Sequence, residues 1–300
     1  MTPLVSQLLH RRLPVITATL LAVFLIVLAR RIGGETTAML VASSLLMFGC
    51  CWASAAHLLG GGAALRLVAI ATSFGWLAEQ LGSSYGWFFG SYTYTPVLGP
   101  RLGDVPVVIP MMWFALAYIG YVIANLIVWQ DPVDRTASLG HDAVMSLLGA
   151  MVVTCYDLGV DPYMVYVLKA WIMARTDGWW FGETVQGFAG WMIVSFAILF
   201  AFRRLARART TSADAAADIG TVLPTMRHVF VPLAVYAGLM VFQVLLGHPV
   251  EARTIALFAM GFPLLAATIG LLRWQGILAR PATDEATPAA VPAEALKEAA

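Results

Sequence analysis

The sequence predicts an all-α membrane protein, a bundle of seven or eight transmembrane helices. Hydrophobic residues make up 60% of the 300 positions and charged residues only 12%, and the mean hydropathy is +0.80. A soluble domain carries about 25% charged residues, so this chain has too little polar material to cover a surface that faces water. We therefore expect a multi-pass protein of the cell membrane that has lipid as its solvent.

Eight stretches reach or approach the roughly 20 apolar residues that a helix needs to cross a bilayer. The first follows Arg11 and Arg12, and no small-residue cleavage site comes after it, so we interpret it as a retained helix rather than a signal peptide. The third contains Arg66 and Glu79 and is the least secure; without it the bundle has seven helices. The predicted spans are residues 13–29, 38–59, 63–81, 105–129, 141–160, 188–202, 229–246 and 252–272.

The distribution of basic residues predicts the orientation of these helices. With eight spans, more Lys and Arg residues lie on the side that holds both termini, so the termini are expected in the cytoplasm. A single transmembrane domain is predicted over residues 1–280. Residues 206–220 are predicted to be a disordered loop, and residues 281–300, made mostly of Ala, Pro, Glu and Thr, a disordered tail.

Several classes of function are disfavoured by composition. The net charge of +1 leaves no basic excess to neutralise phosphates, which argues against a nucleic-acid partner. The three cysteines, Cys50, Cys51 and Cys155, lie in apolar runs, where buried thiols behave as small hydrophobic groups. The histidines are scattered without metal-ligand spacing, so we expect no metal site.

Two predicted interhelical loops share an aromatic pattern. Residues 86–90 and 178–182 both read Gly-Trp-aromatic-Phe-Gly, with carboxylates nearby, and with eight helices both loops lie on one membrane face. Irregular backbone at membrane depth is tolerated only where protein buries it or where it lines a cavity, which predicts a covered pocket. The alternative is a belt of interfacial aromatic residues. The glycines favour the pocket, because a belt does not require them.

Four ionisable residues fall within or beside the predicted spans, and Glu79 is the most informative. It follows Phe74-Gly75-Trp76 near the end of an apolar helix, where desolvation favours the neutral acid, a good proton donor. A salt bridge with Arg66 is the structural alternative, but thirteen helical residues separate the two by about 20 Å. The other two residues are Asp142, which we expect to cap its helix, and Asp157.

Two other classes of membrane protein are disfavoured by the positions of Lys and Asp residues, and a third stays open. A retinal protein needs a lysine inside a late helix, and the chain has only Lys169 and Lys297, neither in such a helix. A membrane prenyltransferase would need facing aspartate pairs, but residues 131–134 and 157–161 are predicted at opposite faces. A transporter with a broken helix and a central carboxylate stays open as an alternative.

The region from about residue 70 to residue 200 resembles the membrane carotenoid 1,2-hydratases of the CruF type, a family that includes the bisanhydrobacterioruberin hydratases. One block comprises residues 79–82 (Glu-Gln-Leu-Gly), 86–94 (Gly-Trp-Phe-Phe-Gly-Ser-Tyr-Thr-Tyr), 98–100 (Leu-Gly-Pro) and 105–114 (Val-Pro-Val-Val-Ile-Pro-Met-Met-Trp-Phe). A second comprises Asp157, Asp161-Pro162, Trp171, residues 178–182 and residues 188–191 (Phe-Ala-Gly-Trp). The second block departs from the family at residues 183–186 (Glu-Thr-Val-Gln), where a small residue and Pro-x-x-Asn are expected.

The resemblance implies addition of water to the terminal double bond of an acyclic, lycopene-like or longer carotenoid, with no cofactor. Glu79 is the expected proton donor and Asp157 the next candidate, and a second carboxylate, Asp104 or Asp161, is expected to orient the water. Aromatic faces are expected to bind the substrate and stabilise a carbocation by about 1–2 kcal/mol each. The alternative is a non-catalytic carotenoid-binding or transport protein with the same pocket. The expected substrate-binding residues are Trp87, Phe88, Tyr92, Tyr94, Trp113, Trp179, Trp180 and Phe181.

Overall fold

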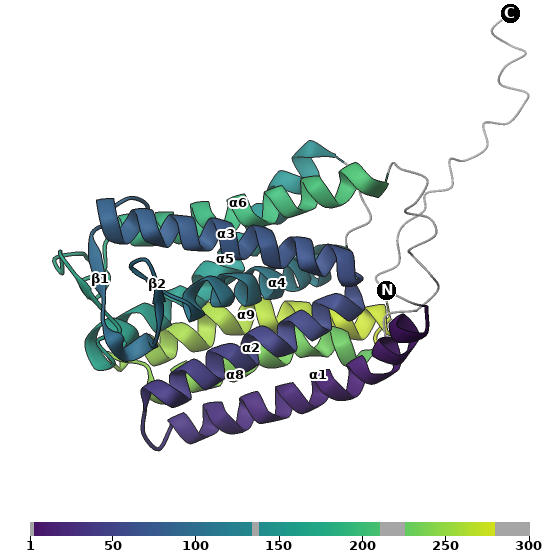
Figure 1. The fold of residues 1–300 in the computed structure, drawn as a ribbon, viewed down its shortest axis with the longest axis horizontal. Coiled ribbons are helices and arrows are strands. Elements are labelled where there is room, and N and C mark those ends of the chain that lie inside the picture. The colour runs from purple at the N-terminus through teal and green to yellow at the C-terminus, as the bar shows by residue number, and fades with distance from the viewer. Residues whose placement is uncertain (1–2, 134–137, 211–225, 280–300) are drawn as a thin grey trace, which may run out of the picture.

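The computed structural model describes residues 3–133, 138–210 and 226–279, most of which are helical (Figure 1). Within these ranges eight helices are long and apolar enough to cross a membrane, so the predicted all-α bundle is confirmed with the larger number of spans. The helices are α1 (Pro3–Arg31), α2 (Thr37–Leu58), α3 (Gly61–Tyr85), α4 (Val108–Trp129), α5 (Leu139–Pro162), α6 (Val185–Thr210), α8 (Met226–Leu246) and α9 (Glu251–Trp274).

Some predicted boundaries differ from the structure. The predicted disordered loop at residues 206–220 is wrong in its first five residues, because α6 continues to Thr210; the rest of that loop, the tail at 281–300 and Asp134 lie outside the described residues. Asp142 does not cap α5. Ser138 is the cap, since its side chain accepts a hydrogen bond from the backbone N–H of His141, and Asp142 in the first turn pairs with Arg204 at 3.3 Å.

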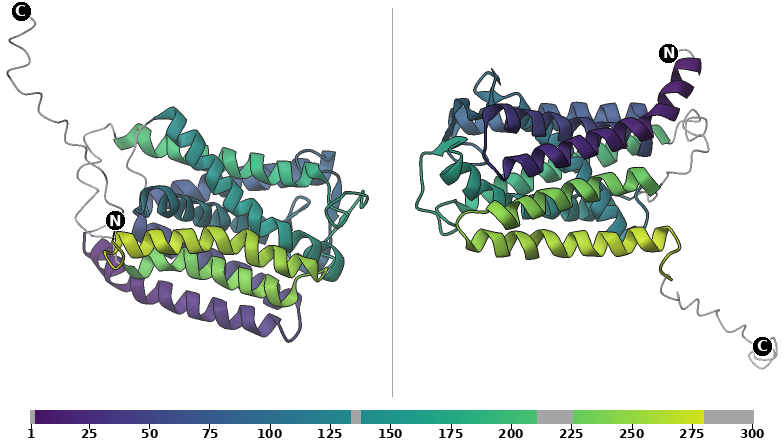
Figure 2. Two further views of the ribbon diagram at one scale, coloured as in Figure 1. Left: turned by 180° about the vertical axis from the view of Figure 1, so that it is seen from behind. Right: turned by 90° about the horizontal axis from the view of Figure 1, so that it is seen from below.

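Helix α4 is the core of the bundle. In an 18-residue window of this helix 78% of the residues are buried, and the helix packs against α2, α3, α5, α6, α8 and α9. Figure 2 shows this packing from behind and from below, with α1 beside α8 at the edge of the bundle. Glycines permit the closest approaches: at Gly120 of α4, a Cβ atom would lie 2.7 Å from the backbone oxygen of Gly149 in α5. Small residues at such crossings are how membrane helices pack without a hydrophobic drive from water.

Two short antiparallel strand pairs lie together at one end of the bundle (Figure 1). Strand β1 (Tyr92–Tyr94), after α3, pairs with β4 (Trp171–Met173), after α5, while β2 (Arg101–Leu102) pairs with β3 (Val105–Pro106). The β1–β4 pair confirms that the loops after α3 and α5 emerge on the same side. The N-terminal end of α1 and the C-terminal end of α9 lie at the opposite end of the bundle (Figure 1).

The crossing of α4 and α5 predicts the effect of adding a single methyl group. Gly120→Ala should lower the free energy of unfolding by about 1–3 kcal/mol, because the new Cβ would meet rigid backbone. Gly261→Ala in α9 is the matched control. Its Cβ would lie 3.8 Å from Met240 Sδ, an ordinary contact, so the better helix propensity of Ala should leave stability unchanged or slightly raised. Thermal unfolding in detergent would measure both, and equal losses would contradict this packing.

Candidate functional site

The side chain of Glu79 lies near the end of α3, is only 6% exposed and is surrounded by hydrogen-bond donors. The hydroxyls of Tyr92 and Tyr94 both donate to its Oε2, the Tyr94 bond being 2.7 Å long. The indole Nε1 of Trp113 donates to Oε1 at 2.9 Å. All its side-chain partners among the described residues are therefore neutral donors, and Arg66, the alternative partner considered from sequence, is not one of them.

Two glycines of α3 make room for these donors. Gly75 lies four residues before Glu79 and thus on the same helix face, and a Cβ there would lie 2.6 Å from the ring of Trp113. At Gly82 a Cβ would lie 3.0 Å from the hydroxyl of Tyr92. The indole of Trp113 therefore reaches Glu79 only because Gly75, one turn earlier in α3, has no side chain.

The backbone after α3 brings the two tyrosines back to Glu79. The helix ends at Gly86, whose φ of 72° is left-handed and reverses the chain. In β1 the side chains alternate in direction, so Tyr92 and Tyr94 are buried on one face while Thr93 is exposed. Pairing with β4 fixes that face, and the Tyr94 ring meets Trp171 edge-on at 5.9 Å between centroids.

Both tyrosines remain neutral donors at physiological pH. Burial raises the pKa of each phenol, and the charge of Glu79 raises it further. Three donors stabilise the charged form of a carboxyl group, whereas desolvation stabilises the neutral form. A tyrosine hydroxyl can also accept a hydrogen bond, so the site can hold Glu79 in either protonation state.

Glu79 lines a cavity with a volume of about 90 Å³ in the interior of the bundle, walled by α1 to α6 and α8. Most of its wall is apolar, and aromatic rings are prominent in it. The rings of Trp113 and Trp191 are 4.5 Å apart between centroids, and Phe89 lies 6.2 Å from Trp113. A second carboxyl group, that of Asp161 at the end of α5, lines the same cavity. The aromatic lining residues are Phe24, Phe89, Tyr92, Tyr94, Trp113, Tyr156, Trp171, Trp191 and Phe242.

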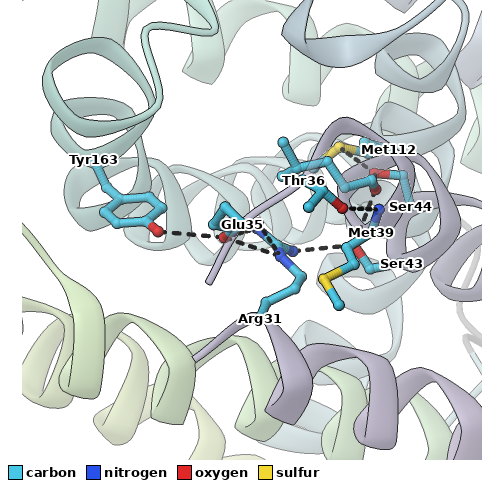
Figure 3. Close-up of polar contacts among 9 residues, drawn as sticks. Arg31, Glu35, Thr36, Met39, Ser43, Ser44, Met112 and Tyr163 are labelled. Carbon is cyan, nitrogen blue, oxygen red and sulfur yellow. Dashed lines mark hydrogen bonds and ion pairs between the residues drawn. The ribbon is translucent and has the colours of Figure 1, made fainter. Parts of the chain in front are cut away.

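A basic residue, Arg31, lines the cavity beside the turn between α1 and α2, and Figure 3 shows its polar contacts. Its guanidinium is 2.9 Å from Glu35 and donates to Ser43 of α2 at 3.0 Å. Glu35 also accepts a hydrogen bond from Tyr163, which follows α5. The Arg31 guanidinium lies over the ring of Phe242 in α8, 4.6 Å from its centroid. Arg31, whose charge is balanced by Glu35, therefore connects α1, α2, α8 and the segment after α5 beside the cavity.

The structure brings together five of the residues expected from sequence and leaves the others outside the cavity wall. Asp104 is exposed and accepts hydrogen bonds from Gln80 and Ser84 on the outside of α3. Trp87 and Trp179 are 57% and 72% exposed, which suits the interfacial belt. The expected residues in the cavity wall are Glu79, Tyr92, Tyr94, Trp113 and Asp161; those outside it are Asp104, Asp157, Trp87, Phe88, Trp179, Trp180 and Phe181.

The shared Gly-Trp-aromatic-Phe-Gly pattern does not correspond to a shared conformation. In the first loop the third residue, Phe88, has a left-handed backbone with a φ of 58°. In the second loop it is the fourth residue, Phe181, that is left-handed, with a φ of 51°. Only the second loop closes on itself, through a bridge between Gly178 and Gly182. The wall residues that sequence reasoning missed include Phe89, Trp171 and Trp191. All three lie in the blocks that carry the family resemblance. The resemblance therefore marks these residues, but it does not indicate which rings face the cavity.

Three acids gather where α5 ends. Asp157 is fully buried, and neither of its carboxyl oxygens has a hydrogen-bond partner among the described residues. Asp161 follows one turn later, and Glu183, 2% exposed, precedes α6. Burial raises the pKa of Glu183, and neither of its carboxyl oxygens has a hydrogen-bond partner among the described residues. Within the described ranges, no group of three or more His, Cys, Asp or Glu side chains is placed to hold a metal ion.

Comparisons with known proteins give one family and one curated relative. A family model described as "Carotenoid biosynthesis protein" matches residues 34–265. The bisanhydrobacterioruberin hydratase of Haloarcula japonica is 34% identical over 132 residues, which are 44% of this chain and 41% of that protein. The chain thus spans less than half the length of this relative. No solved structure matches the chain.

The donors around Glu79 predict a difference between two tryptophans of α4. Trp113→Phe keeps an aromatic ring but leaves Oε1 of buried Glu79 without its donor, which should lower the free energy of unfolding by about 1–3 kcal/mol. Trp129→Phe, at a position that is 42% exposed at the other end of the helix, should change it by about 0.5 kcal/mol or less. Thermal unfolding would compare them, and a loss at Trp129 as large as that at Trp113 would contradict the assignment.

Proposed function

The chain belongs to the family of carotenoid biosynthesis proteins, and from its site we propose that it adds water to the terminal 1,2 double bond of an acyclic carotenoid end group. The product would be a tertiary 1-hydroxy carotenoid. The observation that carries this proposal is Glu79, a buried carboxyl group with three fixed donors in the wall of an aromatic cavity. The hydratase name of the relative from Haloarcula japonica agrees with it.

In the first step, protonated Glu79 gives its proton to carbon 2 of the double bond, leaving a tertiary carbocation at carbon 1. An isolated alkene is a weak base, so the acid must be strong when the proton leaves. The hydroxyls of Tyr92 and Tyr94 and the indole N–H of Trp113 already point at the oxygens on which negative charge then develops. Donors fixed in place before the reaction stabilise such charge without reorganisation, and most effectively where water is excluded.

The carbocation would form beside a group of aromatic rings in the cavity wall. Trp113 and Trp191 pack against each other, with 4.5 Å between their centroids, and Phe89 lies next to Trp113 in the same wall. The negative face of an aromatic ring stabilises a desolvated cation by about 2 kcal/mol. The same rings exclude bulk water, so that the cation survives until a positioned water molecule reacts with it.

A second carboxyl group would then complete the addition. Asp161 lines the same cavity as Glu79. As an ionised group it can orient a water molecule and take the proton that this water loses when its oxygen bonds to carbon 1. One hydrogen is thus added at carbon 2 and one hydroxyl at carbon 1, with no change in oxidation state of the protein.

The size of the cavity suits an end group rather than a whole carotenoid. Its volume of about 90 Å³ lies well below the roughly 300–1,000 Å³ of pockets that enclose a whole drug-sized ligand. We infer that only the terminal part of the substrate enters, while the long polyene stays in the apolar surroundings of the bundle. This accounts for reaction at the end of the chain.

Replacing the proposed acid tests this function. Glu79→Gln keeps the size of the side chain, and its amide oxygen can still accept from Trp113 while a tyrosine hydroxyl accepts from its NH2 group. An amide cannot act as the acid, so the substitution should lower hydration by a factor of about 10² to 10⁴. The measurement is expression in a lycopene-producing host, with analysis for carotenoids that have gained the mass of one water. Folding and carotenoid binding should survive. A Glu79→Gln variant that hydrates at the normal rate would exclude Glu79 as the acid.

The position of the second carboxylate gives a separate prediction. Asp161→Asn should lower hydration by about 10²-fold or more, because the water loses its base. Asp104→Asn should hydrate like the unmodified protein, because Asp104 is exposed and bonded to Gln80 and Ser84 outside the cavity. Rates measured on the same substrate would separate the two, and the reverse ranking would move the water to the Asp104 side.

A further inference from the structure

A groove lined by apolar residues runs between α1 and α8 at the edge of the bundle, where Figure 2 shows the two helices side by side. The groove has a volume of about 360 Å³, which lies within the roughly 300–1,000 Å³ of pockets that bind small molecules. Every residue of its lining is apolar. The groove therefore suits a hydrocarbon chain rather than a polar ligand.

The same two helices border the interior cavity of the candidate site. On α1, Phe24 and Arg31 line the cavity, and they share one helix face because they are seven residues apart. Leu25 and Ile32, one position further along the helix, line the groove instead. On α8, Phe242 lines both spaces. The groove and the cavity therefore lie on neighbouring faces of the α1–α8 pair and meet at Phe242.

Contacts on two sides hold the ring of Phe242 at this meeting point. The Arg31 guanidinium lies 4.6 Å from its centroid, and the ring of Tyr163 meets it edge-on with 5.8 Å between centroids. Glu35 joins these two partners, since it pairs with Arg31 and accepts a hydrogen bond from Tyr163 (Figure 3). A chain that occupied both the groove and the cavity would therefore pass beside an aromatic ring held in one position.

The groove leads along the bundle towards the site end. Its lining on α8 extends from Phe230 to Phe242, twelve residues that rise about 18 Å along the helix. Phe242 lies near the C-terminal end of α8, and α9 runs back from there to the opposite end of the bundle (Figure 1). The end of the groove that meets the cavity is thus the end near the strands.

The proposed substrate is too long for the cavity alone. A volume of about 90 Å³ admits an end group, so the polyene has to continue outside the cavity. A polyene that left the cavity beside Phe242 would enter the groove and lie along α1 and α8. The small residues Ala234, Ala237 and Gly238 of α8 leave room for such a chain.

We propose that this groove binds the polyene of the carotenoid while the end group reacts in the cavity. The inference rests on the proposed function and deepens it, because it assigns a site to the unreacted part of the substrate. A membrane lipid is the competing occupant, and the hydrophobic effect does not choose between two apolar chains that both come from lipid. Rigidity favours the polyene: a conjugated chain is already straight and loses little conformational freedom on docking, whereas a flexible acyl chain loses more.

Carotenoid retention tests the groove independently of the reaction. The full-length protein is purified in detergent from a lycopene-producing host, and the total carotenoid per protein is measured by visible absorbance. The unmodified protein should retain carotenoid. Ala237→Trp fills the groove at a position that does not line the cavity, so it should lower retention by about 5-fold or more.

Ala69→Trp is the matched control for retention. Ala69 is exposed on α3 and lines neither the groove nor the cavity, so this variant should retain as much carotenoid as the unmodified protein. Equal retention by Ala237→Trp and Ala69→Trp would show that the groove holds lipid and would overturn the proposal. An unmodified protein that retains no carotenoid would overturn it as well.

Kinetics separates lost substrate binding from a damaged fold. In vesicles with increasing mole fractions of lycopene, Ala237→Trp should raise KM about 10-fold or more and change kcat less than about 2-fold, because the new ring excludes the polyene and leaves Glu79 with its donors. A lower kcat with an unchanged KM would contradict the groove. If Ala237→Trp does not fold, Val241→Trp, at an exposed groove position, is judged by the same criteria. If the unmodified protein retains lycopene but hydrates none, the proposed function fails, and retention still decides the groove.

Discussion

A carboxyl group inside a membrane-spanning helix must find its hydrogen bonds within the protein, because the hydrocarbon core offers no water to supply them. Glu79 is such a group, and the site end of the bundle is built around this need. Chain reversal at Gly86 and the alternation of β1 bring in two tyrosine hydroxyls. Close packing of α4 on Gly75 brings in the indole of Trp113. The β1–β4 pair then ties this arrangement to the loop after α5, which explains why irregular backbone is present at this end at all.

The contacts that solve the structural problem would also serve the proposed chemistry. Donors that stabilise a charged Glu79 would make it easier for this acid to give up its proton to the substrate. An alkene end group in the cavity beside Trp113 and Trp191 would be the base that receives this proton, and those rings would stabilise the cation that it becomes. The second group of acids, near Asp161, lies in or beside the same cavity. Acid and base would thus line one cavity whose wall is rich in aromatic rings.

Hydropathy and charge predict seven or eight helices, of which the described residues contain eight, because the length of a span follows from the thickness of the bilayer. Glu79 is visible in the sequence as a carboxyl group in an apolar helix. The inward direction of loop side chains is not predictable in this way. Two rings of one motif differ in direction: Phe89 is 6% exposed and Trp87 is 57% exposed, because the left-handed backbone at Phe88 between them redirects the chain. Trp191 and Arg31 reach the cavity through helix packing between distant segments, for which local sequence carries no signal.

The central claim is that water, and no other oxygen source, adds to the carotenoid end after protonation by an acid of the protein. The most direct measurement is mass analysis of the product formed by the full-length protein, once in heavy-oxygen water and once in deuterium oxide. We expect one heavy oxygen in the new hydroxyl group when the reaction runs in heavy-oxygen water. In deuterium oxide we expect one deuterium on the adjacent carbon. A product that carries ordinary oxygen in heavy-oxygen water, or no deuterium on that carbon, would contradict it.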